Sequence, residues 1–417
     1  MEIYKFGGAS LKDAASVKNV AEVLLKTGIK DKVIVVSAMG KMTNAFELVV
    51  RKYLEDLSIP SKELQIVKDY HSSILRELIT DPSHPGYKTL NDLFGELENF
   101  MKHNKSTLYD FVYDQIVCYG ELISSTIVSS FFEKQHIFHT LLDARTLIKT
   151  NSTFRDATVN WTDTQEKITA KVKTGKLYLT QGFIGADANN FSTTLGREGS
   201  DYSAAIIAYC LNAEKVTIWK DVPGVLNADP RVFENPQLLQ QISYEEAIEL
   251  AFFGASVIHP KTLQPLQRKE IPLFVKSFIH PEGEGTSVRK GQTLIPAIPC
   301  FIVKKDQVLI SLSTLDFSFM VEENISEIFR LFHHYQMKVY LIQNSAISFA
   351  VCVDNRFNNL EKLILHLKAR FKVNYTPGVS LYTIRHFDDA ALKMLEKDKE
   401  VLLKQVMQNT VQLVSRN

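Results

Sequence analysis

Cysteine is scarce in this chain of 417 residues: only Cys118, Cys210, Cys300 and Cys352 occur, far apart and without a CxxC pair. This spacing excludes a zinc knuckle and a disulfide framework, so we expect reduced, mostly buried thiols. Long apolar runs are also missing, because none approaches the ~20 residues of a membrane-spanning helix. The first residues lack a basic segment followed by an apolar one and so predict no signal peptide. We therefore expect a soluble, cytoplasmic protein.

Net charge is almost absent, since 48 basic residues face 47 acidic ones and leave +1. This balance argues against a nucleic-acid or membrane surface based on bulk charge, although a local basic pocket for a small anion stays open. The hydrophobic share of 45% and the charged share of 23% exclude a disordered chain. The length suggests two or three domains.

The first part of the chain, residues 1–296, alternates short apolar runs with helical patterns. Strands are predicted at 3–6, 33–37, 177–182, 216–219 and 273–277, and helices at 11–27, 44–57, 61–79, 121–134, 201–211 and 244–252. Nearly continuous apolar strands alternating with helices predict an α/β domain whose mainly parallel sheet is covered by helices. The more polar stretch 61–106 is interpreted as a helical insertion on the surface.

The pattern changes at two prolines near residue 297, and the remaining residues, 297–417, form the second predicted domain. Strands are expected at 308–312, 338–342, 348–353 and 380–385, and helices at 325–334 and 359–371. This βαββαβ order is that of a ferredoxin-like α+β sandwich. A further helix at 389–407 and a strand at 411–414 are expected to follow.

The first predicted strand runs into Lys5, Gly7, Gly8 and Ser10 ahead of a helix. Adjacent glycines let backbone N–H groups approach an anion, and the helix N-terminus and Lys5 add positive charge. The chain contains neither GxxxxGK[ST] nor GxGxxG, so a Walker A loop and a dinucleotide fold lose their main support. Taken alone, the two glycines more often mark an ordinary tight turn.

Polar clusters also follow other predicted strands, where open α/β sheets bind ligands. Ser37 and Thr43 enclose a small-residue segment that serves equally well as a helix cap or as a polar binding loop. A third cluster, residues 193–201, contains Arg197, Ser200 and Asp201. Arginine offers a planar fork for a carboxylate or phosphate, and this cluster is more constrained than a turn requires.

The remaining candidates are charged or hydroxyl residues near predicted strand ends and helix starts: Lys220, Asp221, Arg231, Lys261, Thr262 and Glu121. Asp-Pro-Arg at 229–231 after a Pro-Gly turn suits the edge of a nucleotide. Glu121 is placed near a helix start, where a carboxylate usually complements the dipole, but here it could hold a substrate ammonium group. His259 is interpreted as structural.

These motifs, in this order, resemble those of one family, the aspartokinases of the amino-acid kinase superfamily. The shared motifs are KFGGxS, SAMGxMT, GE, TLGRxGSD, DVPG with DPR, and HPKT, and they cover about residues 1–290. The rest resembles ACT-type regulatory domains more weakly. The resemblance implies ATP-dependent phosphorylation of the side-chain carboxylate of L-aspartate, the entry step to lysine, threonine and methionine.

The resemblance also implies roles for individual residues. Lys5 is the transition-state cation, aided by Mg²⁺ that the nucleotide carries rather than a protein metal site, and Asp201 orders Lys5 or the aspartate pocket. The substrate-binding set is Ser37, Thr43, Glu121 for the ammonium group, Arg197 for a carboxylate, and Ser200. The ATP-binding set is Lys5, Gly7, Gly8, Ser10, Lys220, Asp221, Arg231, Lys261 and Thr262.

Three positions depart from the family pattern in the first part: Ala9 replaces a threonine, Glu198 a common glycine, and Leu226 a tyrosine of some members. In the regulatory part, Glu323 and Tyr340 stand where lysine-sensing relatives have a glycine and an aspartate. A tyrosine carries no charge for a lysine ammonium group, and the second ACT unit looks incomplete. We therefore expect a homodimer formed through the ACT region, with weak or absent inhibition by lysine.

Two other functional classes stay open. One is a sister kinase that acts on glutamate, acetylglutamate, carbamate or a nucleoside monophosphate, against which the ACT region and the GRxGSD motif argue. The other is a non-catalytic ACT sensor with an inactive kinase domain, against which Lys5, Arg197 and Asp201 argue.

Overall fold

The computed structural model describes residues 1–255, 258–316 and 318–416. The chain forms two compact units. The first unit comprises Met1–Val225, Leu238–Ile248 and Val257–Leu294, and the second comprises Leu226–Gln237, Glu249–Ser256 and Ile295–Asn417. Two short segments from the first part of the sequence therefore belong with the second unit, in addition to the residues after 296.

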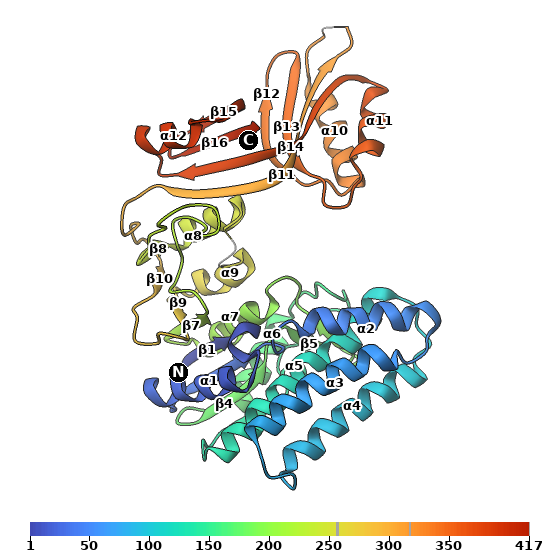
Figure 1. The fold of residues 1–417 in the computed structure, drawn as a ribbon, viewed down its shortest axis with the longest axis vertical. Coiled ribbons are helices and arrows are strands. Elements are labelled where there is room, and N and C mark those ends of the chain that lie inside the picture. Colours follow the sequence, from blue (N-terminus) through green and yellow to red (C-terminus); the bar gives the residue numbers. More distant parts are fainter. Residues whose placement is uncertain (256–257, 317, 417) are drawn as a thin grey trace. The chain divides into compact units, whose positions relative to one another are not determined.

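The first unit is built on an eight-stranded sheet (Figure 1). In spatial order its strands are β3 (Thr140–Leu142), β4 (Leu177–Gln181), β2 (Lys32–Val36), β1 (Glu2–Phe6), β7 (Lys215–Lys220), β9 (Leu273–Ser277), β10 (Thr286–Arg289) and β8 (Gln241–Ser243). All neighbours are parallel except β9 and β10. The predicted mainly parallel sheet is thus confirmed, and the fully buried β2 shows why its sequence is a continuous apolar run.

Helices cover both faces of this sheet. They are α1 (Ala14–Thr27), α2 (Met42–Asp56), α3 (Ser61–Leu78), α4 (Pro85–His103), α5 (Tyr109–Lys134), α6 (Trp161–Lys171), α7 (Gly199–Leu211), α8 (Tyr244–Phe253) and α9 (Pro260–Arg268), with a 3-10 turn η1 at Gly8–Leu11. Side chains alternate along β1, so Phe6 faces the core shared with α1 and α5. Lys5 points to the opposite face, where α7 packs on β1. This alternation places a lysine beside the start of α7.

Two predicted features of the first unit need correction. The helix predicted at 121–134 begins at Tyr109, so Glu121 lies in the middle of α5 rather than near its start. Almost every residue of α5 is buried, so the sequence shows no polar stripe that would mark its first turns. The insertion at 61–106 does form helices, α3 and α4, but both also contribute to the main core through residues such as Leu64, Val67 and Leu97.

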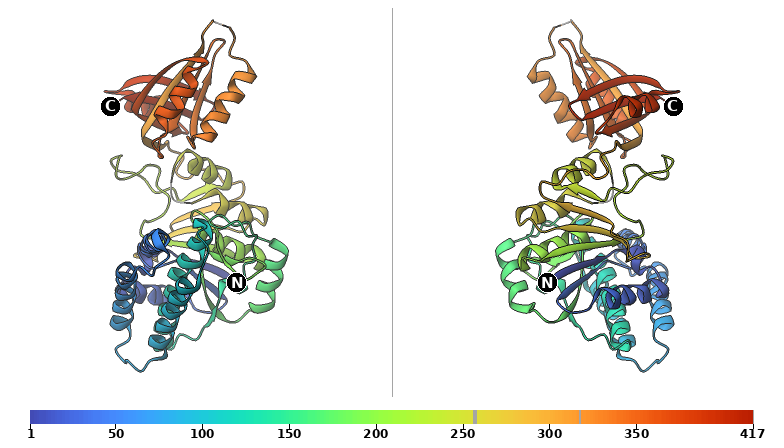
Figure 2. Two further views of the ribbon diagram at one scale, coloured as in Figure 1. Left: turned by 90° about the vertical axis from the view of Figure 1, so that its right-hand side faces the viewer. Right: turned by 90° about the vertical axis from the view of Figure 1, so that its left-hand side faces the viewer.

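The second unit contains a six-stranded antiparallel sheet (Figures 1 and 2). In spatial order its strands are β12 (Val339–Asn344), β13 (Ser348–Asp354), β11 (Cys300–Thr314), β14 (Phe371–Arg385), β16 (Thr410–Arg416) and β15 (Glu400–Met407). The helices α10 (Glu322–His334) and α11 (Leu360–Lys368) cover one face of β11 and β13, where Ile310, Phe332 and Leu363 share a core. The predicted ferredoxin-like βαββαβ order is confirmed by β11-α10-β12-β13-α11-β14.

The last predicted helix is wrong in its second half. Helix α12 covers only Asp389–Glu396, and residues 400–407 form β15, which pairs with β16. Lys397 leaves the helical conformation with ψ 132°, and Asp398, with a left-handed φ of +59°, turns the chain into the strand. The first half of β11, the second half of β14, β15 and β16 form the second part of the sheet, and α12 packs on it through Ala391 and Leu395.

None of the helices in the described ranges combines the length and the apolar character that crossing a bilayer requires.

Candidate functional site

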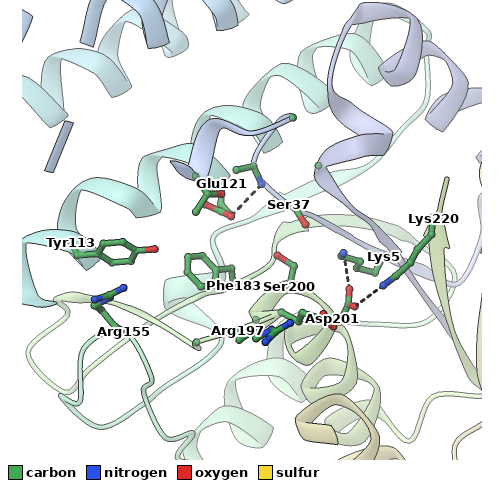
Figure 3. A pocket seen from close by; sticks show the side chains of 17 residues that line it. Lys5, Ser37, Tyr113, Glu121, Arg155, Phe183, Arg197, Ser200, Asp201 and Lys220 are labelled. Carbon is green, nitrogen blue, oxygen red and sulfur yellow. Dashed lines mark hydrogen bonds and ion pairs between the residues drawn. The ribbon is translucent and has the colours of Figure 1, made fainter. Parts of the chain in front are cut away.

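A cavity of about 570 Å³ lies within the first unit, at the carboxyl ends of β1, β2 and β7 (Figure 3). It brings together predicted residues from five separate motifs: Lys5, Gly8, Ser37, Thr43, Glu121, Arg197, Ser200, Asp201 and Lys220. In parallel sheets the carboxyl ends of neighbouring strands meet at one edge, which explains why motifs far apart in sequence converge.

One end of the cavity is organised by Asp201, in the first turn of α7. Its Oδ1 lies 2.6 Å from the Nζ of Lys5, and its Oδ2 lies 3.8 Å from the Nζ of Lys220. The side chains of Lys5 and Asp201 are almost fully buried. Two lysines around one carboxylate leave a net positive charge, which suits an oligophosphate anion.

At this end of the cavity, the loop after β1 and the loop after β2 are in close backbone contact at Gly8 and Gly40. A Cβ on Gly8 would lie 2.6 Å from the carbonyl oxygen of Gly40, so only glycine lets the loop after β1 meet the loop after β2. The N–H of Gly40 donates to the carbonyl of Gly8 at 3.0 Å. Gly7 and Ser10 are not among the lining residues, and the buried Ser10 Oγ has no hydrogen-bond partner.

Glu121 is a buried carboxylate in the cavity wall, with 2% of its surface exposed. Its Oε1 accepts from the backbone N–H of Ala38 at 3.2 Å, whereas its Oε2 has no hydrogen-bond partner among the residues that the structure describes. Burial raises the pKa of Glu121 to about 8, against a weaker opposing effect of the Ala38 N–H. A bound cation would satisfy the unpaired oxygen.

Glu198, which the sequence marked as a departure from a common glycine, also lines the cavity. It lies just before α7 with φ +52°, a left-handed conformation that is strained for residues with a Cβ atom. Its Oε2 is buried and has no hydrogen-bond partner within the described part of the chain. Burial raises the pKa of this carboxyl group, and the nearby Lys220 offsets the effect in part.

We expect Glu198→Gly to stabilise the protein. Glycine adopts positive φ without strain and removes a carboxyl group that is buried without a full set of partners, which together favour the fold by about 1 kcal/mol. Thermal unfolding monitored by circular dichroism measures the change, with Glu198→Ala as the control that removes the carboxyl group but keeps the strain. A lower midpoint for the glycine variant than for the alanine variant would contradict this account.

The cavity also has lining residues that the sequence did not single out, chiefly Tyr113, Arg155 and Phe183. Figure 3 shows Tyr113 and Arg155 at the end remote from Lys5 and Lys220, and Phe183 between that end and Ser200. The predicted start of α5 at 121 left Tyr113 outside any helix, and Arg155 and Phe183 lie in segments without a motif. The basic residue in the polar stretch 151–156 was the only available signal.

Besides Gly7 and Ser10, four further predicted nucleotide residues do not line the cavity. Asp221 is exposed after β7, Lys261 is paired with Asp156, and Thr262 is fully buried. Arg231 belongs to the second unit and pairs with Asp229 at 2.7 Å. Their assignment to the nucleotide, like that of Gly7 and Ser10, stays a prediction.

The sequence pattern of the amino acid kinase family matches residues 1–277. The chain therefore belongs to the amino acid kinase family.

Within this family, the chain is similar to aspartokinases, as the motifs indicated. It is 29% identical to lysine-sensitive aspartokinase 3 of Escherichia coli over 92% of this chain and 86% of that protein. It is 32% identical to bifunctional aspartokinase/homoserine dehydrogenase 2 of Arabidopsis thaliana over 69% of this chain, but spans only 32% of that longer protein.

Solved structures of E. coli aspartokinase III agree in fold. The complex with lysine and aspartate superposes with a TM-score of 0.81 at 26% identity, covering 99% of this chain and 95% of that one. The complex with aspartate and ADP gives 0.79 at 26% identity, covering 100% and 96%. These findings confirm the resemblance stated from the motifs and the combination of an amino-acid kinase fold with an ACT-like second unit.

Proposed function

We propose that this chain is an aspartate kinase, which transfers the γ-phosphoryl group of ATP to the side-chain carboxylate of L-aspartate. The observation that carries the proposal is the cavity itself. It combines the Lys5–Asp201 ion pair at one end with the unpaired buried carboxylate of Glu121 farther along. The Lys5 end suits the phosphate groups of ATP, and the Glu121 carboxylate suits the ammonium group of an amino acid. A kinase that acts on an amino acid needs a binding place for each of these groups.

The reaction requires positioning and charge neutralisation rather than a base. The acceptor carboxylate is already ionised at neutral pH, so one of its oxygens attacks the γ-phosphorus directly while the bond to the bridging oxygen breaks and ADP leaves. Negative charge on the transferring group is stabilised by Lys5, which Asp201 holds at 2.6 Å, and by the nearby Lys220.

The acceptor is bound by complementary charges and hydroxyl groups. Glu121 takes the ammonium group of aspartate, Arg197 takes a carboxylate, and Ser37, Thr43 and Ser200 line the site. ATP is assigned to Lys5, Gly7, Gly8, Ser10, Lys220, Asp221, Arg231, Lys261 and Thr262. Residues 1–296 form the catalytic domain in this proposal. Residues 297–417 form an ACT-type region in which the second of two ACT units is incomplete.

Mg²⁺ enters the proposal with the nucleotide. The cavity fits such a cation because Glu198 offers a buried carboxylate oxygen without a hydrogen-bond partner, a ligand type that Mg²⁺ prefers. Bound there, the ion would neutralise phosphate charge.

The oligomeric state and the cellular location also belong to this proposal. We infer a homodimer formed through the second unit, whose sheet ends in the edge strands β12 and β15. Edge strands present unpaired backbone groups that a second copy can cover. We propose cytoplasmic biosynthesis as the setting, without nucleic-acid or membrane partners.

Trapping the product with hydroxylamine tests the function. Incubation with ATP, Mg²⁺ and L-aspartate should yield aspartyl hydroxamate, because hydroxylamine attacks acyl phosphates. L-Glutamate, N-acetylglutamate, carbamate and UMP serve as parallel acceptors, with ADP release measured for each. Turnover of one of these instead of aspartate would indicate a sister kinase, and ATP binding without any turnover would indicate a non-catalytic sensor.

We expect L-lysine at millimolar concentration to leave aspartate kinase activity nearly unchanged. In the second unit the Nζ of Lys304 lies 3.6 Å from the ring centroid of Tyr340, and Lys338 lies 5.3 Å from it. These two ammonium groups repel a third at the position where lysine-sensing relatives have an aspartate. Asp354, which accepts from the Tyr340 hydroxyl at 3.2 Å, is itself paired with Arg356 at 3.4 Å. Initial rates in a lysine titration, with threonine in parallel, measure the effect; half-inhibition well below millimolar lysine would refute it.

A further inference from the structure

The cavity end remote from Lys5 contains an arginine that the proposed mechanism does not use. Arg155 lines the same cavity as Lys5 and Glu121. Its guanidinium carbon lies 4.5 Å from the ring centroid of Tyr113 and 5.3 Å from that of Tyr109 (Figure 3). Stacking on aromatic rings orients the face of a guanidinium and leaves its N–H edge available for an anion.

The backbone of Arg155 is held in place by a buried carboxylate. Asp114, on α5 and fully buried, accepts from the N–H of Arg155 at 3.0 Å. The same carboxylate accepts from the N–H and the hydroxyl of Thr194 at 2.8 and 2.7 Å. Thr194 ends strand β6 (Ser192–Thr194), three residues before Arg197. One carboxylate therefore ties together the two segments that bring arginines to the cavity.

Arg155 also has an unusual backbone for an arginine, with φ +69°. This left-handed conformation is natural for glycine and strained for most other residues, so it persists where surrounding contacts impose it. The ion pair between Arg155 and Asp110, at 3.4 Å, is weak because both side chains are exposed to solvent. The guanidinium can therefore exchange this partner for a ligand in the cavity.

We propose that Arg155 is a second arginine of the acceptor site, which binds the α-carboxylate that is not phosphorylated, and that Asp114 is its positioning residue. The inference rests on the proposed function. Aspartate carries two carboxylates and one ammonium group. With the reacting carboxylate at the Lys5 end and the ammonium group at Glu121, Arg197 supplies one guanidinium for a carboxylate, and Arg155 supplies a second one from the remote side for the carboxylate that does not react.

Arg155→Gly tests the side chain without straining the backbone, because glycine accepts φ +69° freely. Loss of a hydrogen-bonded charge pair should raise KM for aspartate about 10- to 100-fold, with kcat and KM for ATP changed less than about threefold. Titration calorimetry with L-aspartate alone should show the same loss of affinity. Asp110→Asn removes the exposed ion pair but keeps the guanidinium, so it should leave both measurements unchanged.

Asp114→Asn tests the positioning role. It should raise KM for aspartate with little effect on kcat, and combined with Arg155→Gly it should add little more. Unchanged aspartate affinity in Arg155→Gly would overturn the inference even though the wild type phosphorylates aspartate. If the wild type binds aspartate without phosphorylating it, the proposed function fails, while the calorimetric comparison still decides the role of Arg155.

Discussion

Replacing Lys5 by methionine should lower kcat for aspartyl phosphate formation by about three orders of magnitude. The methionine keeps the length of the side chain but removes the charge that faces the transferring phosphoryl group. KM for aspartate should change little, because Glu121 and the arginines lie farther along the cavity. The hydroxamate assay measures the loss, and retention of more than about a tenth of wild-type kcat would exclude Lys5 from the transition state.

The sheet contains a matched control for this substitution. Lys32 is as buried as Lys5 and lies on the neighbouring strand β2, but it faces Glu2 at 3.3 Å at the opposite ends of the strands. Lys32→Met should therefore cost stability while preserving kcat. Lys5→Met also leaves Asp201 buried near Lys220 alone, so combining it with Asp201→Asn should restore stability without restoring activity.

The sheet and most of the site could be predicted because they follow from local patterns. Buried parallel strands are continuous apolar runs, and polar motifs at their carboxyl ends must converge, which is why Lys5, Ser37 and Lys220 meet in one cavity. The ion pair between Lys5 and Asp201 was anticipated only as one of two roles for Asp201. The alternation of side chains along β1 directs Lys5 toward α7 and so explains the ion pair, whereas the role of Asp201 in the reaction stays a prediction.

The failures have physical causes as well. A helix buried all round, such as α5, lacks the polar stripe that marks where a surface helix begins, so its first turns and Tyr113 were missed. Residues 400–407 form a strand instead of the predicted helix because they pair with β16. No local sequence pattern reveals this pairing. The buried Asp114 holds Arg155 at the cavity by accepting a hydrogen bond from its backbone N–H. The two residues lie far apart in the sequence, so no local pattern indicates this contact.

Glu121 should make aspartate binding depend on pH. With its pKa raised to about 8 by burial, Glu121 is protonated in the unliganded enzyme at lower pH, and it must lose that proton to pair with an ammonium group. KM for aspartate should therefore fall by up to about tenfold per unit as pH rises from about 6 to about 8, then level off. In Glu121→Gln the slope should vanish and KM should be high throughout. A slope that persists in this variant would assign the titration to another group.

Stability provides a test of the same carboxylate that does not involve turnover. The pKa of Glu121 in the folded state, about 8, lies above its ordinary value of 4.5, so between these values the folded state binds a proton that the unfolded state has lost. The stabilising contribution is thus complete below about pH 4.5 and is lost as pH rises through about 8. Glu121→Gln keeps the shape and removes the ionisation, so its thermal midpoint relative to wild type should rise steadily across this window. Saturating aspartate should reduce that difference, because the ammonium group stabilises the ionised form in the wild type alone.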